Sequence, residues 1–147
     1  MSTGRSDATT GSGVKPLRIL VAEDHEKVRH QVCALLEAKG GYEVVAEVSN
    51  GREAVDKAQE LQPEVVVMDI SMPVMGGLEA AAHLRRTAPR SKILFLSQHF
   101  SKAIADIALA TGASGYVVKS DAAIDLVRAV ETISECGRFV SSCLSRS

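Results

Sequence analysis

Carboxylates follow apolar runs at two places in this chain, and they are the first residues that could do chemistry. Val65–Met68 is an uninterrupted apolar run that leads into Asp69, and the earlier run Leu17–Ala22 leads into Glu23 and Asp24. An apolar run without polar alternation is typical of a strand buried on both faces, as in parallel sheets. Ligands of such sheets bind beyond the carboxyl ends of the strands. The three acids are therefore placed for chemistry.

A hydroxyl and an amine follow two further apolar runs, because Ser97 comes after Ile93–Leu96 and Lys119 comes after Gly115–Val118. The acids form an all-oxygen set without clustered His or Cys, which favours a hard ion such as Mg²⁺ and disfavours zinc. One carboxylate could then attack a phosphoryl donor, since aspartate is a nucleophile in aspartyl-phosphate chemistry. The amine and the hydroxyl could contact the phosphoryl oxygens.

The elements that must position these residues alternate five times between strand and helix. Apolar residues recur at helical spacing after each strand, and Gly or Pro residues stop most of the helices. In the last helix we expect Ile124, Val127, Val130 and Ile133 to share the apolar side. The predicted strands are 17–22, 42–48, 65–69, 93–97 and 115–119, and the predicted helices are 26–39, 54–61, 78–87, 101–111 and a segment from 121.

This alternation predicts an α/β fold of five βα units around a parallel five-stranded sheet, joined by right-handed crossovers. The doubly wound order 2-1-3-4-5, as in flavodoxin-like folds, places the ends of the first and third strands side by side. That order gathers all the polar strand ends around one crevice: Glu23, Asp24, Asp69, Ser97 and Lys119.

Length and composition narrow the class of protein. A chain of 147 residues suits one domain. With 17 Lys and Arg against 18 Asp and Glu, it lacks the positive footprint of a nucleic-acid-binding protein, so direct DNA binding is not expected. The three cysteines are an odd number without metal-ligand spacing, which favours a reducing cytosol. No apolar stretch approaches the ~20 residues of a membrane span, so we expect a cytoplasmic protein without membrane contact.

Five motifs in order along the chain resemble the receiver domain of two-component response regulators, the CheY-like fold. The resemblance covers Leu17 to about Phe139, and the segments 115–121 and 137–140 are similar in particular to receivers joined to LuxR-type helix-turn-helix output domains. Any one motif is a weak signal, and together they are specific. The motifs are Glu23-Asp24, Met68-Asp69 with Met72-Pro73 and Gly76-Gly77, Ser97, Gly112–Tyr116, and Lys119.

The resemblance implies a phosphorylation-dependent signalling switch whose only catalysis is its own phosphorylation and dephosphorylation, so an ordinary enzyme is not expected. It implies that Asp69 accepts a phosphoryl group from a sensor histidine kinase with Mg²⁺, or with Mn²⁺ as an alternative ion. Asp24 would bind the metal directly, as would Asp69. Glu23 would act through metal-bound water, and Ser71 would contribute its backbone carbonyl.

The resemblance also assigns the residues that read the phosphoryl group. Ser97 and Lys119 would contact it, and Tyr116 would move between outward and inward rotamers as Ser97 is drawn toward it. Ser71 lies two residues beyond Asp69, and His99 lies two residues beyond Ser97. Both would influence the rate of dephosphorylation.

The surface formed by the fourth helix, fifth strand and fifth helix would change on phosphorylation and serve transcriptional output, partner binding or homodimerisation. Ile104, Ile107 and Ala108 are its candidate contact residues.

The division into segments follows from composition and from the resemblance. Residues 1–15, rich in Ser, Thr, Gly and Asp, are expected to be a flexible tail, because they cannot bury enough apolar surface to offset their ordering entropy. The receiver domain is expected at 16–139. Residues 140–147 would be a tail or the start of a linker to an absent output domain, since they are too few to form one.

Other interpretations of the same residues stay open at this point. Asp69 by itself could be a helix cap or turn residue, and Tyr116 could be only an aromatic anchor. A Mg²⁺-dependent phosphohydrolase of the haloacid-dehalogenase kind would want a second Asp where Ser71 stands. An FMN-binding flavodoxin-like module would want Ser, Thr and Gly after the first strand, where Glu23 and Asp24 stand. A receiver that works by protein contacts alone is the third alternative.

Overall fold

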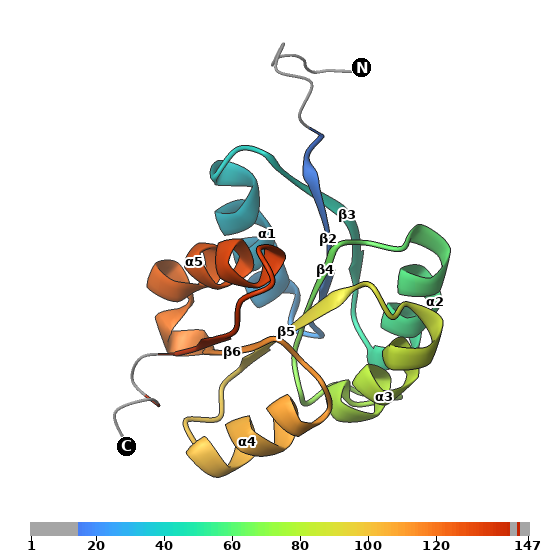
Figure 1. The fold of residues 1–147 in the computed structure, drawn as a ribbon, viewed down its shortest axis with the longest axis vertical. Coiled ribbons are helices and arrows are strands. Elements are labelled where there is room, and N and C mark those ends of the chain that lie inside the picture. Colours follow the sequence, from blue (N-terminus) through green and yellow to red (C-terminus); the bar gives the residue numbers. More distant parts are fainter. Residues whose placement is uncertain (1–14, 142–143, 145–147) are drawn as a thin grey trace.

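The computed structural model describes residues 15–141 and residue 144, which form one parallel sheet with helices on both faces (Figure 1). The predicted N-terminal tail lies, except for Lys15, outside the described residues. The strands and helices are, in chain order, β2 (Leu17–Ala22), α1 (Glu26–Ala38), β3 (Tyr42–Val48), α2 (Gly51–Leu61), β4 (Val65–Met68), α3 (Gly77–Thr87), β5 (Lys92–Ser97), α4 (Lys102–Ala110), β6 (Gly115–Val118), a 3₁₀ turn (Lys119–Asp121), α5 (Ala122–Ser134) and β7 (Phe139–Val140).

The strand order confirms the predicted fold class. The described residues form a six-stranded sheet in the order β3-β2-β4-β5-β6-β7, with every pair parallel. Its first five strands have the predicted 2-1-3-4-5 arrangement, with β3 at one edge. The four central strands are buried almost throughout, which is why their sequences show apolar runs and not alternation.

The helices divide the core into two layers. α1 and α5 cover one face of the sheet, and α2, α3 and α4 cover the other (Figure 1). Two separate clusters of buried apolar side chains result, one on each side of the sheet. No helix among residues 15–141 and 144 is long and apolar enough to cross a membrane.

The sixth strand, β7, was not predicted. It pairs with the edge of β6, with Val140 opposite Tyr116, and the amide of Ser141 donates to the Tyr116 carbonyl over 2.9 Å. The structure thus places Val140 and Ser141 on the sheet, where the sequence analysis expected a tail. A strand of two residues is too short to show an alternating sequence pattern. β7 is held by the backbone groups that β6 would otherwise leave unpaired at its edge. Most of the remaining expected tail lies outside the described residues.

Two expectations about helix faces were wrong. Ile124 was expected on the apolar side of α5, yet it is 69% exposed. The buried side of α5 is instead formed by Leu126, Ala129, Val130 and Ile133, which follow the i, i+3, i+4, i+7 pattern of one helix face. The expected residues were spaced by three, and because a helix has about 3.6 residues per turn, such a series does not stay on one face. On α4, Ala108 was expected at the contact surface, but its side chain is fully buried because it lies on the side of the helix that faces the core. Ile107 lies on a side of α4 that faces away from the core and is 56% exposed.

The loop after β4 is held close to the start of α3 by a glycine. The amide of Gly77 donates to the Ile70 carbonyl over 2.7 Å, and a Cβ at Gly77 would overlap the carbonyl oxygen of Asp69. A side chain here would therefore push α3 away from the strand end. The neighbouring Gly76 has more room, since its Cβ would lie 3.3 Å from the nearest atom, the Ile70 carbonyl oxygen.

We expect Gly77→Ala to lower the free energy of unfolding by about 2 kcal/mol or more, because the overlap is with backbone that cannot rotate away. Gly76→Ala is the matched control and should cost clearly less. Urea unfolding followed by circular dichroism measures both. Equal losses in the two variants would show that the close approach at Gly77 does not limit the packing of α3.

Candidate functional site

The carboxyl ends of β2 and β4 meet where the strand order reverses, and this junction brings the predicted acids together. β2 and β4 are neighbours in the sheet, with Ala22 opposite Met68. The amide of Asp69 donates to the Ala22 carbonyl over 3.2 Å, which fixes the end of β4 beside the loop after β2. Glu23 and Asp69 are both buried there although each carries a carboxylate. Such a switch point is where doubly wound sheets bind ligands.

The amine of Lys119 joins two of the acids. Its Nζ lies 2.8 Å from Oδ2 of Asp69 and 2.7 Å from Oε1 of Glu23, and all three side chains are largely shielded from solvent. Burial alone would lower the pKa of Lys119, but the hydrogen bonds and charges of the two carboxylates outweigh it and raise the pKa above its ordinary value. Lys119 therefore stays an ammonium and offsets part of the acidic charge.

Asp24 and His25 extend the acidic cluster at its exposed side. The ligand atoms of Glu23, Asp24 and His25 can all lie within 4.8 Å of one another. The His25 ring Nδ1 is 3.3 Å from Oε2 of Glu23 and 3.6 Å from Oδ1 of Asp24. Apart from this ring, Oδ1 of Asp24 is buried without a hydrogen-bond partner. The sequence analysis left His25 out of the site, and its adjacency to the two acids was the signal that could have included it.

The donor set fits a divalent hard cation. The Lys119 ammonium contacts the carboxylates of Glu23 and Asp69, and the Asp24 carboxylate lies beside that of Glu23, so negative charge is in excess. The Asp24 oxygen without a hydrogen-bond partner is a group that a cation would satisfy. Oxygen ligands of this kind suit Mg²⁺.

The loop beyond β4 closes over the carboxylate of Asp69. The amide of Ser71 donates to Oδ1 of Asp69 over 3.2 Å, and Ser71 itself is exposed. Both oxygens of Asp69 are thus engaged, Oδ1 by this amide and Oδ2 by Lys119. Two oppositely placed donors hold the carboxylate in one orientation.

A hydrogen-bonded chain connects Ser97 to Tyr116 through the backbone of His99. Ser97 is fully buried at the end of β5, and its Oγ accepts from the His99 amide over 3.1 Å. The hydroxyl of Tyr116 donates to the His99 carbonyl over 2.8 Å, and the ring is fully buried, so it points inward. Burial raises the pKa of Tyr116, a hydrogen bond with Ser97 acts to lower it, and the charge of Asp69 raises it further.

Arg29 contributes to the site, although the sequence analysis did not include it. Its side chain is only 17% exposed; Nη1 donates to the Glu23 carbonyl over 2.8 Å, and Nε lies 3.4 Å from Oε1 of Glu47. Arg29 thereby ties α1 to the loop that carries the acids and to β3. Nothing in the spacing of the helix indicated this, because the contact depends on how α1 packs against the sheet.

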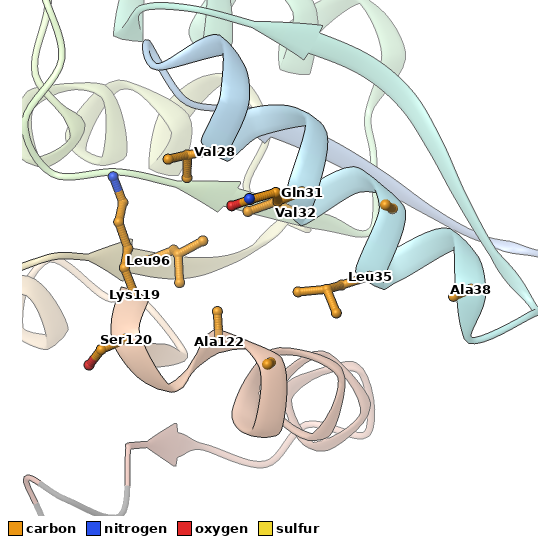
Figure 2. A pocket seen from close by; sticks show the side chains of 11 residues that line it. Val28, Gln31, Val32, Leu35, Ala38, Leu96, Lys119, Ser120 and Ala122 are labelled. Carbon is orange, nitrogen blue, oxygen red and sulfur yellow. The ribbon is translucent and has the colours of Figure 1, made fainter.

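A largely apolar groove of about 500 Å³ runs between α1 and α5 and ends at the site. Figure 2 shows Lys119 at one end of the groove and Ala38 at the other. The side chains of Val28, Val32 and Leu35 line it from α1, and Ser120 and Ala122 line it from the α5 side. Lys119 is therefore shared between the groove and the acidic crevice.

Comparison with known proteins agrees with this geometry. The family model described as "Response regulator receiver domain" matches residues 19–131. The transcriptional regulatory protein LnrK of Bacillus subtilis strain 168 is 37% identical over 121 residues, which cover 82% of this chain and 55% of LnrK. DegU of Brevibacillus brevis, also named a transcriptional regulatory protein, is 35% identical over 124 residues, covering 84% of this chain and 52% of DegU.

Among solved structures, a LuxR-family two-component response regulator from Aurantimonas sp. SI85-9A1 superposes with a TM-score of 0.86 at 38% identity. The match covers 90% of this chain and 94% of that one. The chain spans about half the length of the curated relatives it matches.

We expect Lys119→Met to lower the free energy of unfolding on the order of 2 kcal/mol near neutral pH, because two largely buried carboxylates lose their counter-charge. Since the pKa of Lys119 is raised above 10.5 in the folded protein, its stabilising contribution is complete below pH 10.5 and is lost as the pH rises further. The difference between parent and variant should therefore shrink in alkali.

Urea unfolding from roughly pH 8 to 11.5 measures this difference. Lys102→Met, which changes an exposed lysine on α4, is the control and should stay close to the parent throughout. A difference for Lys119→Met that is constant across the whole range would contradict the ion-pair assignment.

Proposed function

The chain belongs to the response regulator receiver family, and we propose that it is switched by transfer of a phosphoryl group to Asp69. Receivers belong to two-component systems and are not classical enzymes, and a histidine kinase is the partner that such a system implies. The observation that best supports the proposal is the buried Asp69 carboxylate held between the Ser71 amide and the Lys119 ammonium. Family membership decides against the phosphohydrolase and flavin alternatives.

In the proposed transfer, a carboxylate oxygen of Asp69 attacks the phosphorus of the kinase phosphohistidine. The new O–P bond forms as the P–N bond breaks, and the electron pair of that bond stays on the imidazole nitrogen. Lys119 already lies against Oδ2 of Asp69 and would follow the charge that develops on the phosphoryl oxygens. The buried hydroxyl of Ser97 would supply a neutral hydrogen bond to the same group.

Receivers as a family are typically Mg²⁺-dependent. We propose that Asp24 and Asp69 bind the ion directly, Glu23 through water, and Ser71 through its backbone carbonyl, with Mn²⁺ as an alternative ion. When bound, the cation offsets the negative charge of the phosphoryl oxygens and of the acids. The excess of carboxylates over ammonium groups supports this assignment.

Ser71 and His99 are proposed to set the lifetime of the phosphoryl group. Ser71 is exposed beside Asp69, and His99 is half-buried beside Ser97. In this proposal both side chains would stand near the approach that a hydrolytic water takes to Asp69. Their size and polarity would therefore govern its access.

The switch is proposed to run from Ser97 to Tyr116. A phosphoryl group that draws the Ser97 hydroxyl toward Asp69 would draw with it the His99 backbone, whose amide donates to that hydroxyl, and so hold the ring of Tyr116 inward. The His99 carbonyl is the acceptor of the Tyr116 hydroxyl, so the ring would respond. Contacts that exist only in the phosphorylated state are what can shift the equilibrium between two conformations.

The output surface is proposed to comprise α4, β6 and α5. Exposed Ile107 and half-buried Ile104 leave an apolar part of α4 facing outward, which supports a homodimer or a partner contact there. LnrK and DegU are named as transcriptional regulators, and we propose control of transcription for the protein to which this receiver belongs. Ala108, the third residue expected at this surface, is in the core.

Incubation with acetyl phosphate and Mg²⁺ should add one phosphoryl group to the parent protein, measured by intact mass. In this reaction an Asp69 oxygen bonds to phosphorus and acetate leaves with the electrons of the broken P–O bond. Asp69→Asn should show no adduct, and Asp106→Asn, an exposed change on α4, should behave like the parent. An adduct that persists in Asp69→Asn would refute Asp69 as the acceptor and point to another residue. No adduct in the parent would refute the proposal and favour a receiver that acts by protein contacts alone.

Ser97→Ala should still be phosphorylated but should lose the response at Tyr116. The acceptor and its lysine remain, whereas the hydroxyl that connects the phosphoryl group to His99 is gone. The ring resonances of Tyr116 in NMR spectra, before and after acetyl phosphate, report the response. An unchanged response in Ser97→Ala would remove this hydroxyl from the switch.

A further inference from the structure

The segment after α5 returns to the sheet and covers the free edge of β6. β7 is only two residues long, but Ser141 continues its contact with β6 through two further hydrogen bonds. Its amide donates to the Tyr116 carbonyl over 2.9 Å, and its Oγ accepts from the Val118 amide over 2.8 Å. Ser141 is fully buried, so these bonds are shielded from water.

Leu144 fixes the same segment to the face of the sheet covered by α4. It is 1% exposed and belongs to the buried cluster that contains Tyr116 together with Ala105 and Ala108 of α4. Burial of this apolar side chain stabilises the attachment of the segment to the core. We call Phe139, Val140, Ser141 and Leu144 the C-terminal strap.

The strap thus contacts the strand that carries the proposed switch. Tyr116 and Val118, whose backbones bond to Ser141, stand on β6 directly before Lys119. Lys119 contacts Asp69, and the Tyr116 hydroxyl bonds to the His99 carbonyl. β6 is therefore connected to the crevice through Lys119 and to the His99 backbone through Tyr116, and its outer edge is paired with the strap.

β7 is the shortest strand of the sheet that the described residues form, and it lies at the edge with one neighbouring strand, whereas each central strand is longer and has two neighbours. Among the described residues, the two hydrogen bonds of Ser141 to β6 and the buried side chain of Leu144 add to this pairing. Elements with few buried contacts open at lower free energy than the rest of the structure. The strap is consequently suited to exist in two states, seated and released.

We propose that seating of the C-terminal strap is coupled to phosphorylation of Asp69 through Tyr116. The inference rests on the proposed function and goes beyond it by naming the element that moves. With the ring of Tyr116 inward, it packs in one cluster with Leu144. An outward ring would leave this cluster, and the cluster that holds Leu144 would lose its largest fully buried side chain.

The direction of the coupling follows from these contacts. A phosphoryl group that holds Ser97 and Tyr116 in the inward arrangement stabilises the seated strap. By reciprocity, a seated strap raises the affinity of the site for the phosphoryl group by the same factor. Release of the strap in the unphosphorylated protein would expose the edge of β6, so the strap also determines which surface a partner meets.

Hydrogen exchange followed by mass spectrometry tests the coupling on the whole 147-residue chain with acetyl phosphate and Mg²⁺. Amides in peptides that span β6 and Ser141 should exchange roughly fivefold more slowly, or slower still, in the phosphorylated protein. Intact mass on the same samples gives the phosphorylated fraction. Asp69→Asn, treated identically, should show no change in exchange.

Leu144→Ala should lower the phosphorylated fraction at limiting acetyl phosphate and abolish the change in exchange at Val118. Ile124→Ala, which truncates an exposed aliphatic residue on α5, is the matched control and should match the parent. Ser141→Ala is a second variant that removes the hydroxyl acceptor but leaves the apolar contact; it should show a smaller loss. Circular dichroism verifies that each variant is folded.

The outcomes separate the two proposals. An adduct in the parent with unchanged or faster exchange at Ser141 would overturn the coupling while leaving phosphorylation of Asp69 intact. Phosphorylation of Leu144→Ala equal to that of the parent would overturn it as well. Absence of any adduct in the parent would overturn the proposed function and, with it, the coupling.

Discussion

The pairing of the Lys119 ammonium with the buried carboxylates of Glu23 and Asp69 is the interaction on which the site depends. Like charges in a poorly solvated crevice raise one another's energy unless a counter-charge is held against them. Lys119 supplies that charge by contacting two of the acids at once. One ammonium offsets only part of the negative charge of Glu23, Asp69 and the neighbouring Asp24, and this excess is what makes the crevice fit a cation. The same imbalance is what a phosphoryl group and its metal ion would act upon.

The parallel order of the sheet makes this crowding unavoidable. β2, β4, β5 and β6 all end at the same edge, so whatever residue follows each strand is brought to the crevice. Backbone contacts then fix the approach: the Asp69 amide bonds to the Ala22 carbonyl, and Gly77 allows α3 to start against Asp69. Two apolar layers, one on each face, hold the strand ends in place. The site is therefore as rigid as the core beneath it.

The path from the crevice to the opposite edge of the sheet is short. Ser97, His99 and Tyr116 form a chain of hydrogen bonds that crosses from β5 to β6, and Ser141 continues it to the strap. A movement of the Ser97 hydroxyl can change the surface at the strap only if each group in this chain has a second conformation available. In the proposed coupling, the buried ring of Tyr116 and the strap at the edge of the sheet are the two elements that change conformation.

Sequence by itself determined the fold class and the membership of the crevice, because Asp69 and Lys119 each follow an apolar run and parallel strands bring such positions together. Tertiary structure alone decided the contacts that depend on packing. Arg29 had the spacing of a solvated helix residue, and its bond to the loop of acids exists only because α1 lies against β3. Ser141 had no periodicity to reveal it, and it is held by the unpaired edge of β6. Periodic patterns report local burial, whereas which backbone group meets a given side chain across the molecule is set by how the elements pack.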